Sequence, residues 1–190
     1  MGRWQPNARE RLGQAALELY GEYGFEQTTA AQIAARAGLT ERTFFRHYAD
    51  KREVLFGGAQ VLEQTFVAAL AATPRTAAPI DAMASALEAV AGYFEDRRAF
   101  ARQRQAVIMA SADLHERELI KLATLAAALT RTLRERGVPE PAAGLTAEAG
   151  IAVFKVGFER WVGGAEDEER PLLHFLRESL AELKAVAAGE

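Results

Sequence analysis

The chain has 190 residues, 49% of them hydrophobic, and a formal net charge of −3. This is enough apolar material to bury a core, and the small negative charge argues weakly against indiscriminate binding to nucleic acid. Because the sequence has no cysteine, disulfides, thiolate nucleophiles and cysteine-ligated zinc are all excluded.

The amino-terminal stretch MGRWQPNARERLGQ contains charges but no apolar core region, so we expect no secretory signal. The apolar stretches around residues 122–129 fall far short of the roughly 20 residues that cross a bilayer. We therefore expect a soluble, cytoplasmic protein that has no membrane partner.

The first elements in chain order are predicted to be two helices. An apolar stripe with a period of 3.6 residues indicates a helix over residues 7–23. Thr29 is a good cap for a short second helix over residues 30–37. That helix closes at Gly38, where a left-handed residue is favoured.

A third and a fourth helix follow closely. Thr40 is the expected cap of a helix over residues 41–48, and Asp50 is the expected cap of the next one. The fourth helix is predicted to carry one apolar face, which comprises Val54, Leu55, Val61, Leu62, Phe66, Ala69 and Leu70.

Residues 72–79, ATPRTAAP, contain two prolines and interrupt the helical pattern, so they are the best candidate for a loop between two parts of the chain. Further helices are expected beyond it. The predicted segments are a helix from Asp81 to about Arg97, one over 99–110, a long one ending at Gly137, one ending at Gly163, and a last one from about Pro171. No alternating pattern of useful length favours strands, so an all-α fold of about nine helices is predicted.

Two short helices separated by a glycine turn have the form of a helix-turn-helix. A recognition helix in a major groove needs short hydroxyls, arginine and histidine at neighbouring exposed positions, because phosphates and base edges both require donors. Residues 40–51 supply such donors at Thr40, Arg42, Thr43, Arg46, His47 and Lys51. Phe44 and Tyr48 are four residues apart, so they lie on one face and are expected to pack inward.

Residues 24–56, GFEQTTAAQIAARAGLTERTFFRHYADKREVLF, resemble the DNA-binding signature of the TetR family of transcriptional regulators. The TT pair, IA, AG, TFF and the lysine all recur in register. The resemblance implies an amino-terminal three-helix DNA-binding domain, placed at residues 1–56, and a carboxy-terminal helical domain for ligand binding and dimerisation, placed at residues 57–190.

The resemblance also implies roles for individual residues. Thr29 contacts a phosphate and Lys51 meets another one. The residues that face base edges or the adjacent backbone are Thr40, Glu41 and Arg42, and those that line the backbone are Thr43, Phe45 and His47. We choose Arg42 for direct readout because arginine can bond guanine O6 and N7 together. Arg46 is also predicted to contact DNA. The alternative is that its charge is only solvated by water.

Two positions depart from the family pattern. Phe45 stands where the family usually has tyrosine, so a hydroxyl bond to phosphate is lost while the ring can still pack against a sugar or a thymine methyl. Ala31 stands where many members carry a basic residue, which leaves base reading to the third helix.

A small helix-turn-helix reads only a few base pairs, so we expect a homodimer on a palindromic operator. The last two helices are the candidate interface, through the stripes Phe154, Phe158, Trp161, Val162 and Leu173, Leu176, Leu180, Leu183. The alternative is that these stripes form only the core of one subunit.

The resemblance further implies that a small molecule enters the carboxy-terminal domain and releases DNA. We expect its apolar wall from residues 81–162 without assigning any ligand residue, and we expect no metal and no cofactor. HEREL at 115–119 lacks the second histidine of a zinc-protease helix, and no nucleophile elbow or phosphate-binding loop is present.

The predicted function is therefore a DNA-binding regulator and not an enzyme, most simply a ligand-responsive repressor. The alternative is a helical ligand-binding or adaptor protein that has lost sequence-specific DNA binding. The operator, the inducer, and the choice between repression and activation are not specified by the sequence.

Overall fold

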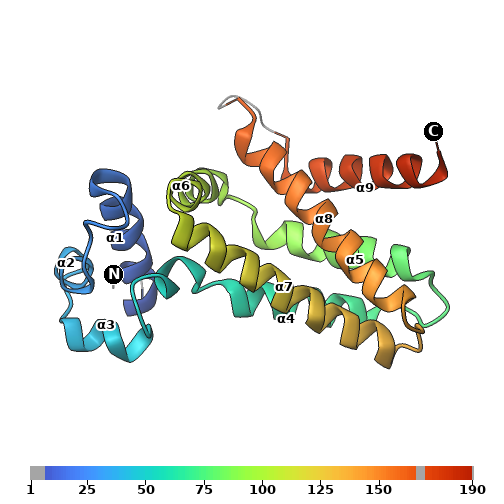
Figure 1. Cartoon of the computed structure of the whole chain (residues 1–190), viewed down its shortest axis with the longest axis horizontal. Helices are drawn as coiled ribbons and strands as arrows, with labels where there is room; N and C mark the ends of the chain where they lie inside the picture. Colours follow the sequence, from blue (N-terminus) through green and yellow to red (C-terminus); the bar gives the residue numbers. More distant parts are fainter. Residues whose placement is uncertain (1–6, 166–169, 190) are drawn as a thin grey trace, which may run out of the picture. The chain divides into compact units, whose positions relative to one another are not determined.

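The computed structural model describes residues 7–165 and 170–189, and within these ranges the chain has nine α-helices and no strand (Figure 1). The prediction of an all-α fold is confirmed. The described residues form two compact units.

Among the described residues, the first unit comprises residues 7–59 together with residues 103–119. Its amino-terminal elements are α1 (Ala8–Tyr23), α2 (Ala30–Arg36), α3 (Glu41–His47) and the 3-10 turn η1 (Glu53–Phe56). α1 packs against α2 and η1, and α2 packs against α3. The fully buried side chains Leu12, Leu17, Ile33 and Phe44 hold these elements together.

The second unit comprises residues 60–102, 120–165 and 170–189 of the part of the chain that the structure describes. The remaining helices are α4 (Ala59–Ala72), α5 (Pro79–Tyr93), α6 (Arg98–Met109), α7 (Ala112–Glu135), α8 (Ala142–Gly163) and α9 (Leu172–Ala188). Figure 1 shows α8 lying across α5, and α8, α5 and α9 all pack against one another. The centre of this unit is aromatic, since the Phe94 ring lies 5.3 Å from Phe158 and 6.0 Å from Trp161 between ring centroids.

The two compact units do not follow a single cut in the chain. Val107, Ile108 and Leu114, which come from the end of α6 and the start of α7, belong to the apolar core of the first unit. The predicted domain boundary after residue 56 stays a prediction about function. In the structure, the end of α6 and the start of α7 pack with the helix-turn-helix in the first unit. Long-range apolar contacts of this kind leave no mark on local periodicity.

The predicted fourth helix is wrong as a single element. The chain forms η1, turns at Gly57, and only then begins α4. A Cβ on Gly57 would lie 3.0 Å from the Tyr48 hydroxyl, so the glycine allows the chain to pass close to α3. Because of the turn, the single apolar face predicted for this region is interrupted, and Val61 is 47% exposed.

The predicted helix from Asp81 to Arg97 is also corrected. α5 begins at Pro79 and has Asp81 in its first turn. Proline is favoured at the first helical position because the backbone N–H that it lacks would have no hydrogen-bond partner within the helix. α5 ends at Tyr93, and Asp96 then adopts a left-handed φ of 59° that cannot continue a helix.

One segment, Glu53–Ala72, is long and apolar enough to cross a membrane by length and composition alone, so the expectation that no stretch reaches that length is wrong. A core helix of a soluble protein can pass the same test. Phe66 and Leu70 of this segment are fully buried among other apolar residues of the second unit, which explains its composition without a membrane.

Candidate nucleic-acid interface

The start of α2 is fixed by a reciprocal cap. Thr29 Oγ1 accepts a hydrogen bond from the Gln32 backbone N–H at 3.2 Å, and Gln32 Oε1 accepts one from the Thr29 N–H at 2.8 Å. This is a capping box, which satisfies two backbone donors that the first turn leaves open. The predicted cap is confirmed, and the Thr29 side chain is exposed.

The turn between α2 and α3 is closed by backbone hydrogen bonds. The Leu39 N–H donates to Ala34 O at 2.8 Å and the Gly38 N–H donates to Ala35 O at 2.9 Å, with Gly38 at a left-handed φ of 64°. These two bonds form a Schellman motif, in which glycine is favoured because other residues are strained there. The Arg11 guanidinium of α1 also donates to Ala37 O, so the turn is held from two sides.

α3 is held by its cap and by buried rings. Thr40 Oγ1 accepts from the Thr43 N–H at 3.2 Å, as predicted. Phe44 is fully buried and Tyr48 is 5% exposed, with their ring centroids 5.8 Å apart. The Tyr48 hydroxyl donates to Arg9 O of α1 at 3.3 Å. The prediction that these two rings pack inward is confirmed, and it sets which side of α3 faces outward.

The outward side of the turn and of α3 presents most of the predicted DNA-binding residues. The exposed ones are Thr29, Thr40, Glu41, Arg42, Phe45 and Arg46, whereas Thr43, His47 and Lys51 are partly buried. The Phe45 ring is 54% exposed and its inner edge packs on Phe44. The structure therefore brings these residues to one helix and its flanks, and their contact with DNA stays a prediction.

The cations of this unit fall into two groups. Arg36 donates to both Glu22 carboxylate oxygens at 3.0 and 2.9 Å, and Arg52 donates to Asp50 at 3.0 Å. By contrast, Arg42 and Arg46 are exposed and form no ion pair with any residue that the structure describes. The charge on the outward face of α3 is thus available to an external anion.

His47 and Lys51 are less available than the arginines. His47 Nε2 is buried and has no hydrogen-bond partner among the described residues, so a phosphate contact would need Nδ1 or a rotated ring. The Lys51 ammonium donates to the backbone oxygens of Phe25 at 2.8 Å, Thr28 at 3.0 Å and Glu26 at 3.3 Å. No feature of the local sequence indicates these three bonds, because their acceptors lie more than 20 positions earlier.

Two ionisable groups next to Lys51 are perturbed. Burial raises the pKa of Tyr20, and the nearby Asp50 charge raises it further, which keeps the hydroxyl that donates to Lys51 O at 2.6 Å protonated. The pKa of Asp50 lies below its ordinary value: desolvation raises it, but hydrogen bonds from the Arg52 side chain and from the Glu53 and Arg52 N–H groups together outweigh that effect.

The apolar stripes predicted on the last two helices lie on α8 and α9 of the second unit. Phe154, Phe158 and Trp161 are buried within the chain itself, as is Leu176 of α9. These four residues are core of one subunit, whereas Leu173, Leu180 and Leu183 of the predicted α9 stripe are only partly buried, and a dimer contact through the last two helices stays a prediction. An inward stripe and an interface stripe have the same period, which is why the sequence left both readings open.

Three arginines of α6 have structural roles. Arg98 Nε donates to Trp161 O at 2.9 Å and Arg102 Nε donates to Val162 O at 2.8 Å, at the carboxyl end of α8. In the first unit, Arg104 Nε donates to Leu55 O at 2.8 Å and pairs with Glu118 at 3.0 Å. Cations at a helix carboxyl end satisfy its last carbonyls.

A capped short helix, a glycine turn and a second capped helix with exposed arginines form a helix-turn-helix motif. The family model described as "Bacterial regulatory proteins, tetR family" matches residues 13–56, the segment just described. Residues 13–56 are therefore similar to the DNA-binding segment of the TetR family of transcriptional regulators.

Similar proteins extend this finding. The HTH-type transcriptional regulator TcmR of Streptomyces glaucescens is 41% identical over 88 residues, which are 46% of this chain and 39% of that protein. A TetR-family regulator of Syntrophomonas wolfei has the same fold over 95% of both chains, with a TM-score of 0.67 and 16% identity. Thermus thermophilus FadR, a repressor solved with lauroyl-CoA, covers 93% of both chains with a TM-score of 0.54 and 24% identity.

The matched residues span less than half the length of the curated relative TcmR. The solved structures, at 16% and 24% identity, extend the likeness in fold to more than nine tenths of the chain.

Proposed function

We propose that this protein is a ligand-responsive transcriptional repressor that binds a palindromic operator as a homodimer and is released by a small molecule. The observation that carries the proposal is the pair Arg42 and Arg46, which are exposed on a helix held rigidly by Phe44 and Tyr48. Neither has an ion pair among the described residues. Leaving cations unpaired on one face suits a partner that supplies phosphates and base edges.

Each residue of the interface has a proposed role. Arg42 reads a base edge, with Thr40 and Glu41 beside it at the start of α3, and Arg46 neutralises a phosphate. The remaining contacts to the DNA backbone come from Thr29, Thr43, Phe45 and His47. Phe45 offers an exposed apolar ring to a sugar or a thymine methyl.

A homodimer through α8 and α9 remains part of the proposal, with different residues from those first expected. The outward side of α8 exposes Leu145 at 68% and Val156 at 49%, and α9 exposes Val186 at 68%. Apolar side chains of this size on neighbouring helices suit an isologous contact. Two recognition helices would then read the two halves of an inverted repeat.

The effector is proposed to bind the second unit. FadR of Thermus thermophilus was solved with lauroyl-CoA, and SmeT, a structure with a TM-score of 0.57, is the repressor of a multidrug efflux pump of Stenotrophomonas maltophilia. The aromatic cluster around Phe94 would supply an apolar wall here. Phe100 and Met109 are exposed, at 43% and 59%, and Val107 lies in the first unit's core, so the proposal does not place these three residues in the wall.

The competing function is a helical adaptor that no longer reads DNA. Because TetR proteins are regulators and not enzymes, we propose no catalytic role. We propose that the protein acts in the cytoplasm, where the DNA is. Salt dependence separates the two functions. Binding through several phosphates weakens steeply as salt rises, whereas an adaptor interface need not respond in that way.

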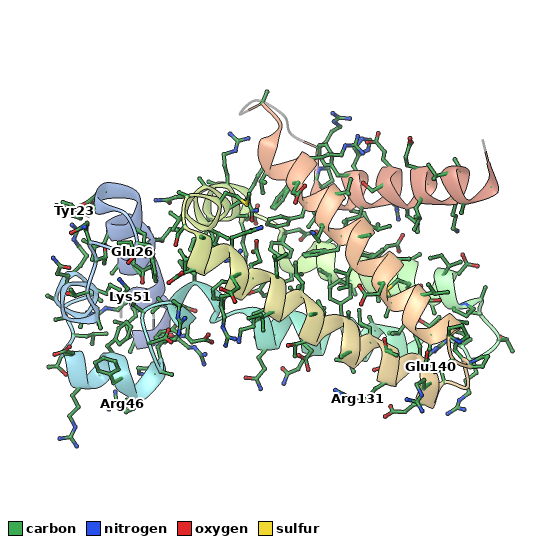
Figure 2. The ribbon with its side chains drawn as sticks, viewed as in Figure 1. Tyr23, Glu26, Arg46, Lys51, Arg131 and Glu140 are labelled. Carbon is green, nitrogen blue, oxygen red and sulfur yellow. The ribbon has the colours of Figure 1, made fainter. Side chains whose placement is uncertain are left out.

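The test is to incubate the protein with fragments of its own genome, recover the bound fragments at moderate salt, and sequence them. An enriched inverted repeat supports the proposal, and diffuse recovery supports the adaptor. On the recovered site, Arg42→Ala should cost about 1–3 kcal/mol and relax the preference at one position. Arg131→Ala, at an exposed position of α7 labelled in Figure 2, is the matched control and should leave affinity unchanged.

A further inference from the structure

The Lys51 ammonium has three N–H donors and no acceptor, and the structure offers it three carbonyl oxygens. These belong to Phe25 at 2.8 Å, Thr28 at 3.0 Å and Glu26 at 3.3 Å. Figure 2 shows Lys51 and Glu26 close together within the first unit. The ammonium also lies 4.2 Å from the centroid of the Phe25 ring, a cation–π contact that adds to the three bonds.

The three acceptors belong to the loop that joins α1 to α2. Thr28 of this loop is 1% exposed, and its hydroxyl donates to Gly24 O at 2.9 Å. The next residue is Thr29, the cap of α2. Because Lys51 holds the Thr28 carbonyl, it fixes the peptide plane that enters the capping box.

Lys51 is itself held from the other side. Its carbonyl oxygen accepts a hydrogen bond at 2.6 Å from the hydroxyl of Tyr20, a buried residue of α1. A single residue therefore connects α1, the α1–α2 loop and the chain that leaves α3. Arg46, by contrast, extends outward from α3 and is exposed.

We propose that Lys51 is a positioning residue, which holds the α1–α2 loop and through it Thr29 in the orientation for DNA, and that it is not a phosphate ligand. This inference rests on the proposed DNA binding. A phosphate contact would require the ammonium to break at least one of its three hydrogen bonds to carbonyl oxygens. Each carbonyl oxygen released in this way would then need another donor.

The two roles predict opposite results for two substitutions. Lys51→Met keeps the length of the side chain and removes all three donors. Lys51→Arg keeps the charge, but its planar fork cannot direct three bonds to three converging carbonyls. A positioning role predicts that both variants lose at least about tenfold in operator affinity, since each breaks hydrogen bonds to a charged group. A phosphate contact predicts that arginine restores the affinity.

The salt dependence gives a second readout. Removing one phosphate contact lowers the slope of log affinity against log salt by about 0.9. Arg46→Met is the matched control and should show this change. Lys51→Met should lose affinity with a much smaller change in slope, because its charge does not face the phosphates.

The third readout needs no DNA. Without ligand or DNA, amide hydrogen exchange at residues 28–33 should be faster in Lys51→Met than in the parent protein and unchanged in Arg46→Met. If the parent protein binds no specific DNA, the proposed function fails and this exchange measurement still tests the positioning role. Unchanged exchange, or Lys51→Arg with parental affinity, would overturn the inference.

Discussion

The contact between α8 and α9 depends on a glycine, and Gly157→Ala tests it. A Cβ at Gly157 would lie 2.8 Å from Leu176 Cδ2 and 3.2 Å from both the Cα and the N of Leu176. Carbon atoms prefer separations of about 3.5–4.0 Å. The leucine methyl group can rotate away, but its backbone belongs to α9, so the helix itself must move by a few tenths of an ångström.

Gly144→Ala in the same helix is the matched comparison, since its Cβ would have only Glu140 Oε2 near it, at 3.5 Å. Both substitutions gain up to about 1 kcal/mol of helix propensity, so the difference between them isolates the packing cost. Overpacking of this kind costs about 1–3 kcal/mol.

Chemical and thermal denaturation at one protomer concentration measure this difference. We expect Gly144→Ala to be more stable than the parent protein and Gly157→Ala to be about 2 kcal/mol less stable than Gly144→Ala. For a chain of this size, such a gap corresponds to roughly 4–8 °C in Tm. Equal stability of the two variants would refute the argument that α8 and α9 approach through this glycine.

Three further outcomes are expected. Thr29→Ala should lose about 1 kcal/mol of stability with the capping box and should also bind the operator more weakly, whereas Thr29→Ser should retain both; melting curves and DNA titrations check this. Arg104→Ala should destabilise the protein by about 1.5–3 kcal/mol because it removes hydrogen bonds from a charged group, while Arg131→Ala should stay within about 0.5 kcal/mol. Asp50→Asn should reduce acid sensitivity: the pKa of Asp50 is lower in the folded state, so its contribution to stability is present above the unfolded pKa and is lost as pH falls through the folded pKa. Unfolding measured between pH 7 and pH 2 should therefore show a smaller loss for Asp50→Asn, and parallel curves would contradict the role given to Asp50.

The sequence by itself determined the helix-turn-helix. The caps at Thr29 and Thr40 act on N–H groups three residues away, and Gly38 supplies a left-handed φ at a single position. These effects are local, so they can be read from adjacent residues. The buried faces of α1 and α3 followed from periodicity, because Phe44 and Tyr48 are one helical turn apart.

Only the tertiary structure decided what the long side chains and apolar stripes contact. Lys51 finds its acceptors 23–26 positions earlier, and Arg102 finds Val162 O 60 positions later. The stripe at Phe154 proved to be core, because a period of 3.6 residues shows that one face is apolar and not what covers it. The physical reason is the same in each case: a flexible cation or an amphipathic face can be satisfied by many partners, and the packing of distant segments selects among them.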